Sequence, residues 1–296
     1  MTEPFHRQHH YHRITALLDR IHGQIIPHGA NYGQISRTEA EFLLNRVLDE
    51  RPRHIVELGT AAGVSTAYML CALNMLDLPD ISGISGTAGT GTSDRRLTAI
   101  EYLDHCYFDP SRTPGFIVDE VFPRHPQGYS LHLNTSGFDL KTLTQCCPID
   151  MLFVDANHTH PWATLDTILA LPFLAPNAII VYHDINLHHR GGAAKVHDKG
   201  PHSVFYHLPA AQKAVVGEFP YPNIGSLRLV TPPRETLENL LGILFRFPWE
   251  PQAWPFLDAP TLQRFGDYVE HHWGPDAARS FRQGLNSLEP AKVAAS

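Results

Sequence analysis

Two apolar stretches of the chain each end in an aspartate with a histidine nearby. The stretch Ile149–Val154 is followed by Asp155 and, three residues later, by His158. A second apolar stretch is followed directly by His183 and Asp184. Runs of this kind are typical of buried strands in a parallel sheet, where ligands bind at the carboxyl ends of the strands. We therefore expect these four polar side chains to meet at one edge of a sheet.

This combination of side chains suits metal binding or proton transfer. An unpaired carboxylate at the end of a buried strand is costly, so Asp155 needs a cation or several hydrogen-bond donors. Carboxylates and imidazoles bind divalent cations, and an imidazole also takes up protons near neutral pH. Three structural alternatives stay open: Asp155 as a helix cap, His158 as a loop histidine, and His183 with Asp184 as groups that only end a strand.

A turn rich in small residues predicts a nucleoside site. After an apolar strand the chain reads Glu57-Leu58-Gly59-Thr60-Ala61-Ala62-Gly63. Small residues let the backbone approach a ligand closely, and glycine tolerates a positive φ. Ser65 and Thr66 fall at the start of the next helix, whose free N–H groups favour an anionic group. A dinucleotide fingerprint would read GxGxxG with no acid before it, so this turn is of another kind. A tight turn without a ligand is the alternative.

The elements that position these residues alternate between strands and helices. Five strands are predicted, at His54–Leu58, Leu97–Glu101, Tyr129–Leu133, Ile149–Val154 and Ala178–Tyr182. Two further strands are expected near the sheet edge, at Ser203–His207 and Ser226–Val230. Ser36 and Glu39 form a capping box that predicts a helix start, and more helices are expected after the glycine turn, after Pro161 and beyond Arg234. This order predicts an α/β fold: a Rossmann-like, doubly wound, mostly parallel sheet of about seven strands with helical N- and C-terminal additions.

The same reading divides the chain into three parts. We expect an N-terminal helical segment over 1–50, a nucleoside-binding domain over 51–232 and a C-terminal helical extension over 233–296. Residues 82–95 are rich in Gly, Ser and Thr and predict a surface loop, because nothing in them compensates the entropy of ordering.

Composition limits the classes of function. Hydrophobic residues make up 43% of the 296, enough for a sizeable core, so a disordered chain is not expected. The net charge of −7 gives no electrostatic footprint for nucleic acid or a membrane surface. The N-terminus lacks an apolar signal region, and no run of about 18 apolar residues occurs, so no transmembrane helix is predicted. The cysteines form no CxxC pair and predict reduced thiols and a cytoplasmic location; they are Cys71, Cys106, Cys146 and Cys147.

The glycine turn resembles motif I of the class I S-adenosylmethionine (SAM) methyltransferases. In that family the turn contacts the methionine end of SAM, and an acid after the second strand holds the ribose hydroxyls. By this resemblance Glu101 is the expected ribose ligand, and Asp104 is the alternative. The cofactor contacts that the resemblance implies are Glu57, Gly59, Thr60, Ala61, Gly63, Ser65, Thr66, Glu101, Ser136 and Asp155.

The element Asp155-x-x-His158, followed by a helix and a strand that ends in an acid, resembles a narrower group. This group is the metal-dependent natural-product O-methyltransferases of the macrolide-sugar type, with their cephalosporin hydroxylase-like relatives. The resemblance implies that Asp155 and Asp184 hold Mg²⁺ and that His158 is the general base. His183 stands where these enzymes carry a glutamate. Since imidazole is a poor magnesium ligand, a site of Asp155, His183 and Asp184 would take a softer metal or none.

The sequence thus predicts a SAM-dependent methyltransferase that acts on a hydroxyl of a small molecule, such as a natural product or a sugar. His158 and Asp155 are the expected catalytic residues. By resemblance, the terminal helices cover the active site or form a homodimer. Two alternatives remain: a metal-dependent hydrolase or hydroxylase-like enzyme that uses the same aspartates and histidines, and a non-catalytic SAM-binding regulatory protein.

Overall fold

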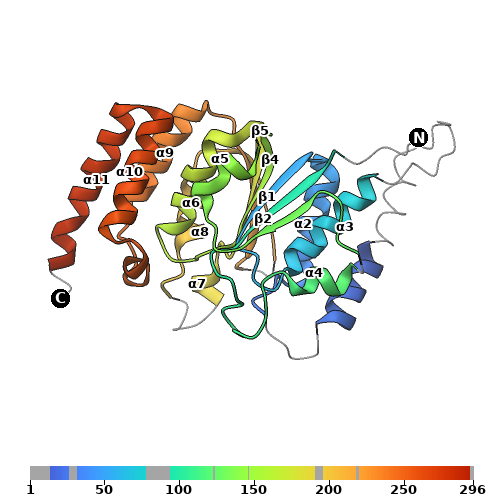
Figure 1. The fold of residues 1–296 in the computed structure, drawn as a ribbon. Coiled ribbons are helices and arrows are strands. Elements are labelled where there is room, and N and C mark those ends of the chain that lie inside the picture. The colour runs from blue at the N-terminus through green and yellow to red at the C-terminus, as the bar shows by residue number, and fades with distance from the viewer. Residues whose placement is uncertain are drawn as a thin grey trace. The chain divides into compact units, whose positions relative to one another are not determined.

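The computed structural model describes most of the chain (Figure 1). The described residues are 14–26, 32–77, 94–122, 124–145, 147–190, 196–217 and 220–293. They form two compact units, one up to Thr135 and one from Ser136 onward. Most of the predicted loop at 82–95 lies outside the described residues. The three-part division at residues 50 and 232 stays a prediction.

The first unit carries the glycine turn on a parallel sheet. Its strands are β1 (His54–Leu58), β2 (Arg96–Ile100) and β3 (Tyr129–His132), in the order β3-β2-β1. All five residues of β1 are buried, as expected for a strand covered on both faces. The helical elements of this unit are η1 (Asp19–Ile25), α2 (Arg37–Glu50), α3 (Val64–Asp77) and α4 (Phe116–Val121).

Helix α2 begins where the capping box predicted. The Ser36 hydroxyl accepts a hydrogen bond from the Glu39 backbone N–H at 3.3 Å, and the Glu39 carboxylate accepts one from the Ser36 N–H at 2.7 Å. These two bonds satisfy donors that a helix start otherwise leaves free. The helix ends at Glu50, because Arg51 has a φ of 50° in the left-handed region and Pro52 follows.

The second unit carries the aspartates and histidines. Strand β4 (Ile149–Val154) pairs parallel to β5 (Leu174–His183). Strand β7 (Ile224–Arg228) runs antiparallel to β5, and β6 (Ala211–Val216) runs antiparallel to β7, which gives the order β4-β5-β7-β6. Helix α6 (Trp162–Ala170) follows β4 and begins directly after Pro161.

One predicted strand is wrong and one strand was missed. Residues Ser203–His207 belong to helix α8 (Gly200–His207). A short apolar run reads alike as strand or helix, and here Pro201 in the first turn and the bond from the Leu208 N–H to the Val204 carbonyl define a helix. The missed strand is β6, whose mixed and half-exposed residues (AQKAVV) give no clear alternation.

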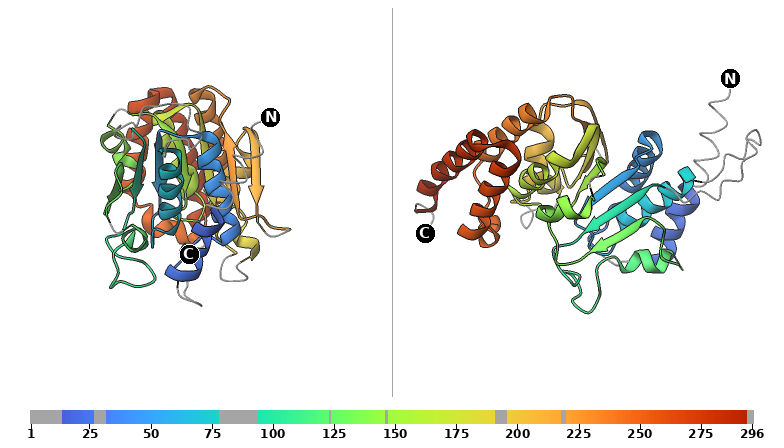
Figure 2. Two further views of the ribbon diagram at one scale, coloured as in Figure 1. Left: turned by 90° about the vertical axis from the view of Figure 1, so that its right-hand side faces the viewer. Right: turned by 45° about the horizontal axis from the view of Figure 1, so that its top comes forward.

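The C-terminal part is helical, as the sequence predicted. Helix α11 (Pro275–Val293) packs against α9 (Pro233–Arg246) and α10 (Ala259–Trp273) (Figure 2, orange to red). Helix α9 also contacts α6 and α8. A short 3₁₀ segment, η5 (Pro251–Phe256), joins α9 to α10. The remaining short elements are η2 (Gly137–Asp139), α5 (Leu140–Leu143), η3 (Leu171–Phe173) and α7 (Leu187–Arg190).

The two units together contain seven strands with helices around them, and most strand pairs are parallel. This confirms the predicted Rossmann-like α/β class with helical additions. Among the helices that the structure describes, none is both long enough and apolar enough to cross a membrane.

Candidate active site

The glycine turn between β1 and α3 has the backbone that close approach requires. Gly59 and Gly63 adopt φ values of 90° and 86°, and Ala61 between them has a φ of 45°. A Cβ on Gly63 would lie 2.8 Å from the Cα of Gly115, so a larger residue does not fit there. The sequence therefore needs glycine at this position for both conformation and space.

Three of the predicted cofactor residues hold one another. Glu57 is fully buried, and its two carboxylate oxygens accept hydrogen bonds from the hydroxyls of Ser65 and Thr66, each at 2.5 Å. These bonds satisfy the buried charge and attach the start of α3 to the end of β1. A direct contact of these three side chains with a cofactor stays a prediction.

Glu101 lies at the glycine turn, and its role as the ribose ligand stays a prediction. Its Oε2 accepts hydrogen bonds from the backbone N–H groups of Thr60 and Ala61, both at 3.0 Å, and its Oε1 accepts one from Leu103 at 3.2 Å. The alternative, Asp104, is exposed and pairs with His105 at 2.7 Å. Of the two acids, Glu101 is therefore the one joined to the turn.

Ser136 opens the second unit, where it caps the short helix η2. Its backbone N–H and its hydroxyl both donate to the Asp139 carboxylate, at 3.1 and 3.4 Å. A contact between Ser136 and a cofactor stays a prediction.

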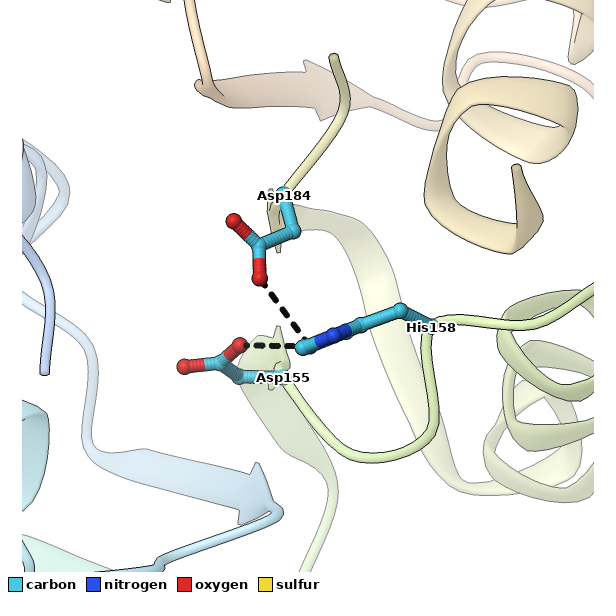
Figure 3. Close-up of side chains that lie close together, drawn as sticks. All are labelled: Asp155, His158 and Asp184. Carbon is cyan, nitrogen blue, oxygen red and sulfur yellow. Dashed lines mark hydrogen bonds and ion pairs between the residues drawn. The ribbon is translucent and has the colours of Figure 1, made fainter. Parts of the chain in front are cut away.

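The second unit brings Asp155, His158 and Asp184 together (Figure 3). Asp155 follows β4 and Asp184 follows β5, and because these strands are parallel their carboxyl ends meet at the same edge. Nε2 of His158 lies 3.1 Å from Oδ2 of Asp184 and 3.4 Å from Oδ1 of Asp155. One imidazole nitrogen thus faces two carboxylates.

The loop that carries His158 is shaped by Asn157. The Asn157 side-chain oxygen accepts hydrogen bonds from the N–H and the hydroxyl of Thr159, at 2.9 and 2.7 Å. Such an Asx turn reverses the chain locally. It turns His158 back toward the strand end that carries Asp155.

His183 binds Asp155 from the buried side. Its Nδ1 lies 2.9 Å from Oδ1 of Asp155 and 3.6 Å from Oδ2 of Asp184, and only 5% of His183 is exposed. Among the described residues, the group whose ligand atoms lie close enough for one ion contains His158 and not His183. The predicted metal role of His183 is untested, but its contact with Asp155 identifies it as a residue that holds this carboxylate.

Asn223 is a site residue that sequence reasoning did not assign. Its side-chain amide donates to Oδ1 of Asp184 at 2.5 Å, and its backbone carbonyl accepts from Ile185 at 3.1 Å. Asp184 itself has a φ of 57°, a left-handed conformation that is uncommon for residues other than glycine. Backbone strain of this kind concentrates at functional sites, where surrounding contacts maintain it. Only the position of Asn223 before the late strand β7 could have pointed to it.

The charges of these groups shift their proton affinities. Burial would raise the pKa of Asp155, but the positive charge of His183 and hydrogen bonds from both imidazoles hold it below its ordinary value. Burial would lower the pKa of His158, but the carboxylates of Asp184 and Asp155 raise it above its ordinary value. The site therefore favours ionised carboxylates beside a protonated imidazole.

The same three residues have the composition of a divalent-cation site. Their ligand atoms all lie within 4.8 Å of one another, and two carboxylates with one imidazole suit Mn²⁺, Fe²⁺ or Zn²⁺ better than Mg²⁺. An ion held by all three would use Nε2 of His158. A neutral imidazole bound through Nε2 keeps its proton on Nδ1, so His158 would then not be a base. His158 can therefore be a metal ligand or the general base, but not both at once.

Comparison with known families identifies the class. Residues 56–185 match the family described as "Methyltransferase domain". The matched segment contains the glycine turn, Glu101, Asp155, His158 and Asp184. Residues 56–185 thus resemble a methyltransferase domain, in agreement with the resemblance that the glycine turn indicated. No curated protein matches the chain.

Several solved structures are similar in fold. One is the O-methyltransferase TomG from Streptomyces achromogenes in complex with SAM (TM-score 0.47, 21% identity, 74% of this chain and 89% of that chain). Another is an O-methyltransferase from Bacillus cereus in complex with SAH (TM-score 0.46, 15% identity, 73% and 90%). A third is CalS11, a TDP-rhamnose 3'-O-methyltransferase of calicheamicin biosynthesis (TM-score 0.46, 13% identity, 78% and 97%).

Proposed function

We propose that this protein is a SAM-dependent O-methyltransferase that acts on a hydroxyl of a small molecule, with His158 as the general base. The observation that carries the proposal is the His158 imidazole held by Asp155 and Asp184 within a methyltransferase domain. A natural product or a sugar is the acceptor class we favour. The net charge of −7 speaks against a nucleic acid.

The glycine turn and Glu101 supply the groups that SAM needs. The turn leads into the start of α3, where N–H groups favour the carboxylate of the methionine end. A glutamate at the end of β2 can accept hydrogen bonds from both ribose hydroxyls. The ribose hydroxyls would then take the place of the Thr60 and Ala61 N–H groups as hydrogen-bond donors to Glu101.

The transfer itself is an in-line displacement. The acceptor oxygen forms a bond to the methyl carbon while the carbon–sulfur bond breaks, and the sulfonium becomes the neutral thioether of S-adenosylhomocysteine (SAH). The hydroxyl proton passes to His158. If Nε2–H of His158 donates to the aspartates, Nδ1 is the nitrogen that accepts this proton, and the two carboxylates stabilise the resulting imidazolium.

A divalent cation fits the donor set of Asp155, Asp184 and His158. Such an ion would lower the pKa of a bound hydroxyl and orient the acceptor. In that state the base would have to be another group, since His158 would be a ligand. A metal-dependent hydrolase that uses the same three residues is the second candidate function, and the absence of any SAH binding would favour it.

Titration calorimetry with SAH tests the cofactor. We expect micromolar binding with and without EDTA. A folded protein that does not bind SAH would contradict the methyltransferase proposal and bring the hydrolase forward.

The variant His158→Ala tests the base. We expect turnover to fall by about 10²-fold or more, while SAH affinity stays unchanged, because general-base catalysis contributes to the transfer and not to cofactor binding. The exposed His189→Ala is the control. If His158→Ala methylated an acceptor of the wild-type protein at nearly the wild-type rate, His158 would have no role as the base.

Chelation separates the two roles of His158. If His158 is the base, EDTA leaves the transfer intact or raises it. If EDTA abolishes the transfer and Mn²⁺ or Zn²⁺ restores it, His158 is instead a metal ligand.

The variant Asp155→Asn should lower the activity whether His158 is a base or a ligand, since Asp155 contacts both histidines.

A further inference from the structure

A buried glutamate from the C-terminal part of the chain lies behind the loop of His158. Glu250 stands between α9 and η5 and is 6% exposed. Its Oε2 accepts hydrogen bonds from the backbone N–H groups of His160, at 2.5 Å, and Lys199, at 3.1 Å. The Glu250 N–H in turn donates to the His160 carbonyl at 2.9 Å. One residue thus binds two separate segments of the second unit.

These two segments also bind each other at His158. The Gly200 N–H donates to the His158 carbonyl at 2.7 Å. A Cβ on Gly200 would lie 2.7 Å from that carbonyl oxygen and 2.8 Å from the carbonyl oxygen of Thr159, so only glycine allows this approach. The backbone of His158 is therefore held from the side of α8, while its ring meets the aspartates.

The side chain of His160 completes the attachment. His160 is 1% exposed, its Nε2 lies 3.3 Å from the Leu244 carbonyl, and its ring packs edge-on against Phe247. Through His160, two residues after His158, the loop thus contacts the end of α9. Without Glu250, the buried His160 N–H would lose its acceptor, and the loop could then move.

From these contacts we infer that Glu250 is a positioning residue that holds the His158 imidazole against Asp155 and Asp184. Glu250 touches neither aspartate through any contact that the structure describes, so its effect passes through the backbone of residues 158–160. Catalytic geometry is sensitive to shifts of this kind, because a displacement of about 1 Å can cost about 10²-fold in rate. The inference rests on the proposed function of His158.

The variants Glu250→Ala and Glu250→Gln test the inference in the full-length protein. Only one carboxylate oxygen accepts the two N–H groups, and the carbonyl oxygen of glutamine can replace it. We expect Glu250→Ala to lower kcat by about 10- to 100-fold, with the KM for SAM changed by less than about threefold. Glu250→Gln should keep kcat within about threefold of wild type.

Two further variants supply the control and an independent route. Glu238→Ala removes an exposed glutamate from α9 and should leave kcat unchanged. Gly200→Ala should lower kcat in the same way as Glu250→Ala, because its Cβ would displace the His158 carbonyl. A wild-type kcat in a folded Glu250→Ala variant, or an equal loss in Glu250→Gln and Glu250→Ala, would overturn the inference.

Hydrogen exchange separates this inference from the proposed function. Faster exchange over residues 156–161 in Glu250→Ala, and not in Glu250→Gln, supports the attachment whether or not an acceptor is methylated. Unchanged exchange there would overturn the attachment. An absence of transfer by the wild-type protein would instead count against the proposed function alone.

Discussion

At the scale of single residues, the site depends on one nitrogen atom. Nε2 of His158 lies within 3.4 Å of Asp155 and 3.1 Å of Asp184. Two negative charges beside one imidazole stabilise its protonated form, so the pKa of His158 is raised even though burial opposes this. Such a group is a stronger base but requires a higher pH to be neutral.

This shift predicts the pH dependence of the reaction. A general base must be unprotonated, so kcat/KM should fall as the pH falls through the raised pKa of His158. Replacement of Asp184 by Asn removes one stabilising charge, lowers that pKa and should move the acid limb to lower pH. Asparagine suits the site because it tolerates the φ of 57° and can still accept from Asn223.

The measurement is a kcat/KM profile in EDTA-treated buffer for the wild type, Asp184→Asn and a control. Asp276→Asn is the matched control, since this aspartate is exposed on α11. An acid limb that stays in place in Asp184→Asn would show that another group sets it.

At the scale of elements, local signals define the start of α2. Ser36→Ala removes the hydroxyl that accepts from Glu39 and should lower the free energy of unfolding by about 1 kcal/mol. Thr38→Ala, an exposed position within the same first turn, should change it much less. Urea denaturation measures both, and equal effects would mean that the capping bond does not stabilise the helix.

Two glycines should respond in opposite directions to alanine. Gly63 has a positive φ and a neighbouring backbone 2.8 Å from an added Cβ, so Gly63→Ala should destabilise by more than about 1 kcal/mol. Gly242 lies inside α9 with open space around it, so Gly242→Ala should stabilise by roughly 0.5–1 kcal/mol. Thermal melts of the two variants test this, and a shift of the same sign in both would contradict it.

At the scale of the whole molecule, cofactor binding should appear as stability. SAH at about 100 times its Kd should raise the free energy of unfolding by about 2.7 kcal/mol, because the unfolded chain does not bind it. Glu101→Gln keeps an acceptor for the turn but removes the charge that the ribose hydroxyls need, so the increase should shrink. Asp104→Asn is the matched control and should keep the full increase; the reverse result would make Asp104 the ribose ligand.

Much of this protein follows from its sequence, because the signals are local. The five main strands and the α2 capping box are found where the apolar runs and the Ser36–Glu39 pair predicted them. The meeting of Asp155 and Asp184 also follows, since each ends one of two apolar runs and parallel strands align their carboxyl ends. The glycine turn carries its own requirement for positive φ.

Other features depend on which distant segments the fold brings together. Ser203–His207 is helical with Val204 and Phe205 buried, whereas a short apolar run alone is compatible with a strand or a helix. Asn223, directly before β7, contacts Asp184, and Glu250 contacts His160 from 90 residues along the chain. In the sequence, no pattern around Asn223 or Glu250 distinguishes them from ordinary loop residues. Only tertiary packing decides that their polar atoms, once buried, find their partners at this site.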